Sequence, residues 1–172
     1  MSGMAKTGKV INAMIEYFGS DVRRINHFLK VFSFAKTIGE GESLEPKEQE
    51  LLEVAAVVHD IGIKVSEQKY NSSAGKYQEL EGPAEAEKLL ISLSYDEKFI
   101  EDVKYLVAHH HTYDCISTKP YQILVEADFI VNLYEDNSSI KAIRSAYDRI
   151  FKTETGKKIM RTMYPDGCEE SV

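Results

Sequence analysis

The residues of this chain that could do chemistry are its histidines and two aspartates in apolar surroundings. The five histidines lie within or at the end of apolar stretches: His27, His59, His109, His110 and His111. Asp60 directly follows His59, and Asp128 interrupts an apolar run between 123 and 131. A carboxylate beside an imidazole in such surroundings is costly unless it is paired or binds a metal. One such histidine alone is usually a hydrogen-bonded core residue, but the whole set indicates one shared metal site.

The donor types restrict the metal. Mixed imidazole and carboxylate ligands favour a divalent transition metal such as Fe, Mn, Co, Ni or Zn, whereas Mg and Ca prefer all-oxygen sites. Cys115 and Cys168 lie far apart without metal-site spacing, which argues against a structural zinc site. A catalytic ion of this kind lowers the pKa of a bound water to about 7 and neutralises charge on a phosphoryl group. Such an ion is therefore suited to hydrolysing a phosphate ester.

The elements that must position these residues are predicted to be helices, because apolar residues recur at helical spacing between sparse Pro and Gly. The expected helices span residues 6–18, 22–38, 46–58, 83–91, 97–111, 121–134, 140–151 and 155–163. We expect Ser20 or Asp21 to cap the second helix, Asp96 the fifth and Ser138 the seventh. The third helix is apolar nearly all round, so it is predicted to be the buried central helix.

Residues 63–80 are polar and include Asn71-Ser72-Ser73 and Gly75, so they are predicted to form a functional loop. No segment shows the alternation of a strand. The sequence therefore predicts an all-α fold, a compact single-domain helical bundle. Its motif-bearing core is expected at about 21–135, followed by C-terminal helices at 138–163 and a polar tail at 164–172.

Length and charge bound the class of protein. The chain has 172 residues, 43% of them apolar, which is enough for one core. Its formal net charge of -7 disfavours nucleic-acid binding but not a small phosphate-bearing partner, because a bound metal reverses the local charge. No run approaches the roughly 18 apolar residues of a membrane span, and Met1–Val10 lacks the apolar core of a signal peptide. A cytoplasmic location is the expectation.

The order of these residues resembles the HD superfamily of metal-dependent phosphohydrolases. The resemblance rests on His27, the segment Val57-Val58-His59-Asp60-Ile61-Gly62, the histidine cluster and Glu126-Ala127-Asp128. It covers roughly residues 25–132. It implies an HD-type helical bundle in which one metal is held by four residues, which here are His27, His59, Asp60 and Asp128.

The same resemblance raises the question of a second metal. Relatives with two ions use the Asp of the His-Asp pair as a bridge, together with a His after the loop and two later histidines. This chain has Glu81 where many relatives have that His, and a carboxylate can also ligate. His109 and His110 best match the paired histidines, with His111 as the alternative. Whether a second ion binds is left open by the sequence.

The function that the resemblance implies is a metal-dependent phosphohydrolase, a phosphomonoesterase or phosphodiesterase acting on a nucleotide or another small phosphate ester. Asp60 is the expected shared catalytic ligand. Lys64 is the expected phosphate contact, although many relatives carry Lys where this chain has Ile63; Arg23 and Arg24 are further candidates. The alternatives are a di-iron oxygenase of HD type and a non-catalytic, metal-bearing sensor or interaction module. The sequence sets neither substrate, metal identity nor oligomeric state.

Overall fold

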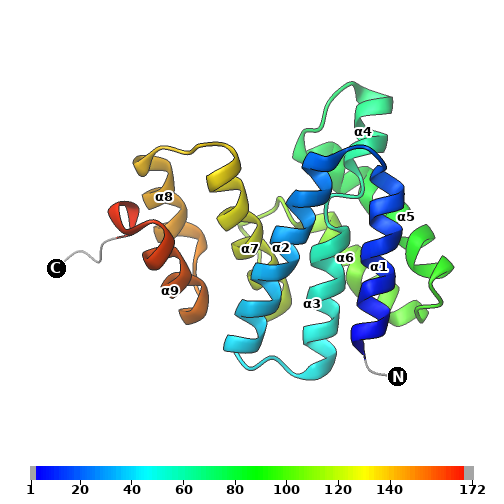
Figure 1. Ribbon diagram of the computed structural model, residues 1–172, viewed down its shortest axis with the longest axis horizontal. Coiled ribbons are helices and arrows are strands. Elements are labelled where there is room, and N and C mark those ends of the chain that lie inside the picture. The colour runs from blue at the N-terminus through cyan, green and yellow to red at the C-terminus, as the bar shows by residue number, and fades with distance from the viewer. Residues whose placement is uncertain (1–2, 169–172) are drawn as a thin grey trace.

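The structure is a computed structural model that describes residues 3–168, and these residues form helices and no strand (Figure 1). In chain order the elements are α1 (Gly3–Phe18), α2 (Val22–Gly41), α3 (Pro46–Val58), α4 (Ile63–Tyr70), α5 (Gly75–Ser92), α6 (Glu97–His109), α7 (Lys119–Glu135), α8 (Ile140–Ile150), α9 (Glu154–Met163) and the 3-10 turn η1 (Pro165–Gly167). The predicted all-α class is confirmed. Among the described helices none is both long and apolar enough to cross a membrane. The end of the predicted polar tail, residues 169–172, lies outside the described residues.

Side-chain caps set the beginning of several helices. The Asp21 carboxylate accepts a hydrogen bond from the backbone N–H of Arg24, and Asp96 accepts one in the same way at the start of α6. Both caps were predicted. The cap of α8 is Ser139 and not Ser138, because it is the Ser139 hydroxyl that accepts from the backbone N–H of Ala142. Such caps satisfy N–H groups that have no partner within the helix.

The predicted loop at 63–80 was wrong, since most of it is helical. Helix α4 occupies its first half, and α5 begins at Gly75, so that Pro83 lies inside α5 instead of opening it. The apolar pattern missed α4 because this helix buries little more than Ile63 and Ser66. Contacts between helices hold it instead: the Arg24 guanidinium lies 2.6 Å from the Glu67 carboxylate.

Helix α3 lies at the centre of the molecule, as its apolar sequence predicted. It packs against α1, α2, α6 and α7, and every residue from Val54 to Val58 is fully buried. Figure 1 shows α8 and α9 together at one end, beyond α7, and α1, α5 and α6 toward the other. The chain leaves the C-terminal end of α3 inside the protein, so His59 and Asp60 emerge into the interior.

A buried carboxylate joins α7 to the segment between α8 and α9. Glu126 is fully buried, and its Oε1 accepts hydrogen bonds from the backbone N–H groups of Lys152 at 2.7 Å and Thr153 at 2.9 Å. The same oxygen accepts from the Gln122 amide at 2.8 Å, and Oε2 accepts from the Thr153 hydroxyl at 2.5 Å. Glu126 therefore has a structural environment of its own, away from Asp128, as its place two residues earlier on the helix predicted.

Two glycines allow the turn after Asp60 to touch α5. A Cβ added at Gly62 would lie 2.7 Å from the backbone N of Gly82 and 2.8 Å from the carbonyl oxygen of Gln78. Both neighbours are backbone atoms, which cannot move aside as a flexible side chain can. This contact holds the turn that carries Asp60 against α5.

Gly62→Ala is therefore expected to lower the free energy of unfolding by about 1–3 kcal/mol through overpacking. Gly8→Ala is the matched control, because a Cβ there meets nothing within 4 Å, and helix propensity alone would raise stability by up to about 1 kcal/mol. Urea denaturation of both variants in a chelator measures the two effects. Equal stability of Gly62→Ala and the parent protein would show that the close approach is not tight.

Candidate metal centre

Three parts of the fold bring four potential ligands together in the interior. His27 comes from α2, the His59-Asp60 pair follows the last turn of α3, and Asp128 comes from α7. Their exposed fractions are 7%, 0%, 9% and 3% respectively. The structure thus assembles the four residues that the sequence predicted for one metal.

The distances between the ligand atoms match a metal site. His27 Nε2 lies 3.1 Å from Asp60 Oδ2 and 3.2 Å from Asp128 Oδ1. His59 Nε2 lies 3.4 and 3.3 Å from the same two oxygens, and the two Nε2 atoms are 3.3 Å apart. Ligands at about 2.0–2.1 Å around a tetrahedral ion stand roughly 3.3–3.4 Å from one another. The spacing therefore fits a transition-metal ion between these atoms.

The hydrogen bonds of the two imidazoles leave their Nε2 lone pairs pointing at each other. His59 Nδ1 donates to the Ala56 carbonyl at 2.7 Å, and His27 Nδ1 donates to Glu135 Oε2 at 3.0 Å. In a neutral imidazole Nε2 is then an acceptor. Asp128 Oδ1 is buried and has no hydrogen-bond partner among the described residues, although both Nε2 atoms are near. Facing acceptors repel one another, and a cation bound between them would accept their lone pairs and remove that repulsion.

The electrostatics of the cluster favour positive charge. Burial lowers the pKa of His27, but the carboxylates of Asp128 and Asp60 outweigh it and raise that pKa to about 11. Burial raises the pKa of Asp60, but His59, His110 and His27 hold it well below its usual range. Both directions show that the cluster keeps its carboxylates ionised and attracts a proton or a metal ion.

Glu135 orients His27 from behind. Its Oε2 accepts from His27 Nδ1, while its Oε1 lies 2.7 Å from Lys30 Nζ. Glu135→Ala is expected to weaken metal binding by about 10- to 100-fold, because carboxylates behind ligating histidines fix the tautomer and the ring orientation. Chelator competition measures that affinity. Glu53→Ala is the control, since Glu53 pairs with Lys36 and not with a histidine; equal losses in both variants would rule out a specific role.

A second cluster lies beside the first and shares Asp60. Its members are Asp60, His110 and His111. His110 Nδ1 donates to the Val107 carbonyl at 2.7 Å, and its buried Nε2 has no hydrogen-bond partner among the described residues, 3.5 Å from Asp60 Oδ1. His110 therefore presents a free Nε2, as a metal ligand would.

His111 is engaged differently, by a residue that the sequence analysis missed. Its Nε2 donates to Gln78 Oε1 at 3.2 Å, and the Gln78 amide in turn donates to the Ser73 carbonyl at 2.7 Å. Gln78 is 7% exposed and lies one helical turn before Gly82, on the face of α5 that meets the site. Helical spacing across 75–92 was the signal that could have found it, had that segment not been interpreted as a loop.

Three predicted site residues lie elsewhere. His109 Nδ1 donates to the Tyr105 carbonyl at 2.7 Å, so the structure places His111, and not His109, beside His110. Glu81 Oε1 accepts from the Tyr70 hydroxyl at 2.7 Å and its Oε2 from Lys69 at 2.8 Å. Lys64 donates to the Tyr17 carbonyl at 3.0 Å. For the histidines the reason is local geometry. Helix α6 ends at His109, so the chain turns after it and places His110 and His111 beside Asp60.

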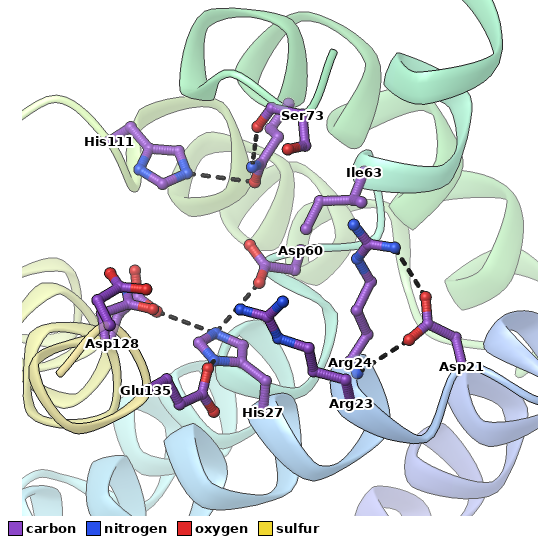
Figure 2. Close-up of a pocket in the computed structure, with 13 residues that line it drawn as sticks. Asp21, Arg23, Arg24, His27, Asp60, Ile63, Ser73, His111, Asp128 and Glu135 are labelled. Atoms are coloured by element: carbon purple, nitrogen blue, oxygen red, sulfur yellow. Dashed lines mark hydrogen bonds and ion pairs between the residues drawn. The ribbon is translucent and has the colours of Figure 1, made fainter. Parts of the chain in front are cut away.

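A cavity of about 440 Å³ opens onto the first cluster, with His27, Asp60 and Asp128 in its wall. Two arginines also line it. The Arg24 guanidinium is bound by Asp21 at 2.7 Å and Glu67 at 2.6 Å, whereas Arg23 makes no hydrogen bond or ion pair with any described residue. Figure 2 shows the Arg23 side chain extending toward Asp60 and His27. Arg23 is therefore free to bind an anion beside the metal centre.

Comparison with known proteins identifies the family of this chain. The model of the HD domain family matches residues 24–143, most of the chain, and the protein therefore belongs to the HD-domain family. A similar solved structure is the crystal structure of a predicted HD superfamily hydrolase from an uncultured Thermotogales bacterium. The two are 24% identical with a TM-score of 0.66, over 91% of this chain and 83% of that one, a likeness that bears on the fold. No curated protein matches the chain.

Proposed function

We propose that this protein is a metal-dependent phosphohydrolase that cleaves a small phosphate ester, as a phosphomonoesterase or phosphodiesterase. The observation that carries the proposal is a buried group of facing acceptors, on His27, His59, Asp60 and Asp128. Three of these residues, all but His59, line a cavity that also holds an unpaired arginine. The acceptors suit a divalent transition metal, and the arginine suits a phosphate. Membership of the HD-domain family supports a hydrolase.

The metal, when bound, supplies an activated water and neutralises charge on the phosphoryl group. The residues of the chain do the rest. Arg23 binds phosphate oxygens with its fork of N–H donors. Asp60 would help to hold the metal; its Oδ2 faces His27 and its Oδ1 faces His110. The burial of His59 and Asp128 keeps water from competing for the ligand atoms.

The alternatives make different demands on the second cluster. A di-iron oxygenase needs a second ion at Asp60, His110 and His111, and the Nε2 of His111 is already committed to Gln78. A metal-bearing sensor needs no substrate contact, and the unpaired Arg23 in the cavity favours an enzyme over it. We therefore place hydrolysis with at least one ion first.

Metal analysis tests the proposal. Protein purified without added metal or chelator is expected to carry about one or two equivalents of Fe, Mn, Co, Ni or Zn, and His59→Ala and Asp128→Ala are expected to lose them. His109→Ala is the matched control, because this imidazole lies outside both clusters, and it should retain the metal. A panel of phosphomonoesters and phosphodiesters is then assayed with that metal. Metal that stays in both ligand variants, or a loaded protein inert on the whole panel, would refute the proposal.

A further inference from the structure

One face of α7 runs from the metal centre along the cavity wall. Asp128 and Asn132 on α7 and Asp136, the C-cap directly after it, follow one another at intervals of four residues, and all three line the cavity. Residues at this spacing share one face of a helix. With a rise of about 1.5 Å per residue, Asn132 stands roughly 6 Å and Asp136 roughly 12 Å along the axis from Asp128.

The two outer residues have no partner within the part of the chain that the structure describes. Neither the Asn132 amide nor the Asp136 carboxylate makes a side-chain hydrogen bond or an ion pair there. Glu135, which lines the same cavity, is by contrast occupied by His27 and Lys30. Beyond the metal, α7 thus offers one free amide and one free carboxylate to a ligand.

These groups select the chemistry of that ligand. A carboxylate can only accept hydrogen bonds, and an amide both donates and accepts. The Asp136 carboxylate at this end would repel a second phosphate, whereas the charge of Glu135 is already compensated by Lys30. An organic group that carries hydroxyls meets both demands. The cavity volume of about 440 Å³ is in the range of small-molecule sites, which is about 300–1,000 Å³.

We propose that the Asn132 and Asp136 face of α7 binds the hydroxylated organic group of a phosphomonoester whose single phosphate lies at Arg23 and the metal. This inference rests on the proposed function and narrows its substrate to small sugar-like phosphates. The apolar residues that would suit an aromatic group line a different hollow of about 580 Å³, beside Phe129, Leu133 and Ile150.

Binding of three phosphonates to the metal-loaded protein tests the proposal by isothermal titration calorimetry. Their C–P bond is not hydrolysed, so binding is measured without turnover. The probes are methylphosphonate, the phosphonate analogue of ribose 5-phosphate and phenylphosphonate. The ribose analogue is expected to bind about 10- to 30-fold tighter than methylphosphonate, as two added hydrogen bonds would give. The double variant Asn132→Ala with Asp136→Ala should remove this advantage and leave methylphosphonate affinity unchanged.

Two control variants distinguish failure of this inference from failure of the proposed function. Asn26→Ala removes an amide that bonds the Val22 carbonyl on α2 and should leave all three affinities unchanged. Arg23→Ala should weaken all three phosphonates together. If methylphosphonate binds through Arg23 but the ribose group adds nothing, or phenylphosphonate binds tightest, this inference alone is overturned. If no phosphonate binds, the proposed function fails and this inference fails with it.

Discussion

Asp60→Ala is expected to lose bound metal and to reduce phosphate-ester hydrolysis by at least about 10³-fold, the effect of several kcal/mol of lost metal assistance. We expect Asp60 to matter most among the four candidate ligands because its two oxygens face different partners. Oδ2 lies 3.1 Å from His27 Nε2, and Oδ1 lies 3.5 Å from His110 Nε2. Metal content by inductively coupled plasma mass spectrometry and initial rates on the same sample measure both losses.

Glu81→Ala is the informative comparison for Asp60→Ala. The sequence predicted both residues as ligands, but the structure pairs Glu81 with Lys69 and Tyr70. We therefore expect Glu81→Ala to retain metal and activity. Asp60→Asn keeps the size of the side chain and removes its charge, so it separates the loss of a ligand from the loss of packing. Full metal content in Asp60→Ala would contradict the assignment of the whole centre.

Glu126→Ala is expected to lower the free energy of unfolding by about 3 kcal/mol, because it leaves four partly buried donors without their acceptor. Among these donors are the backbone N–H groups of Lys152 and Thr153, which lie between two helices and have no helical partner. Urea denaturation in a chelator measures the loss without any contribution from metal. Metal affinity should change far less than in Asp60→Ala, because Glu126 does not touch the centre.

Glu101→Ala is the surface control for Glu126→Ala. Glu101 is an exposed acid on α6 whose partner is Lys104, and such pairs contribute between 0 and about 1 kcal/mol. If Glu126→Ala unfolded at the same urea concentration as Glu101→Ala, the junction between α7 and the last two helices would not depend on the buried carboxylate.

The parts of the fold that the sequence predicted well are those with a strong apolar pattern. Helix α3 is apolar nearly all round, and it is the buried centre of the molecule. The same pattern exposed His59 and Asp128 as polar interruptions, and the structure brings both to one point. Polar residues in an apolar stripe are informative because burying them without a partner is costly.

The parts that the sequence did not predict depend on contacts between elements. Helix α4 has little apolar surface and is held by pairs such as Arg24 with Glu67, which no local pattern reveals. The choice between His109 and His111 depends on the residue at which α6 ends, and helix ends are the least certain part of a pattern. Gln78 entered the site only because its segment is helical.

The hydrogen bonds of Glu126 also limit how far the chain can be truncated at its C-terminal end. The HD family match ends at residue 143, yet three of the four donors to Glu126 come from beyond it, at Lys152 and Thr153. A chain that ended at residue 143 would retain the buried Glu126 carboxylate and lose three of its hydrogen-bond donors. We therefore expect the smallest autonomous folding unit of this protein to extend past the segment that the HD family model matches.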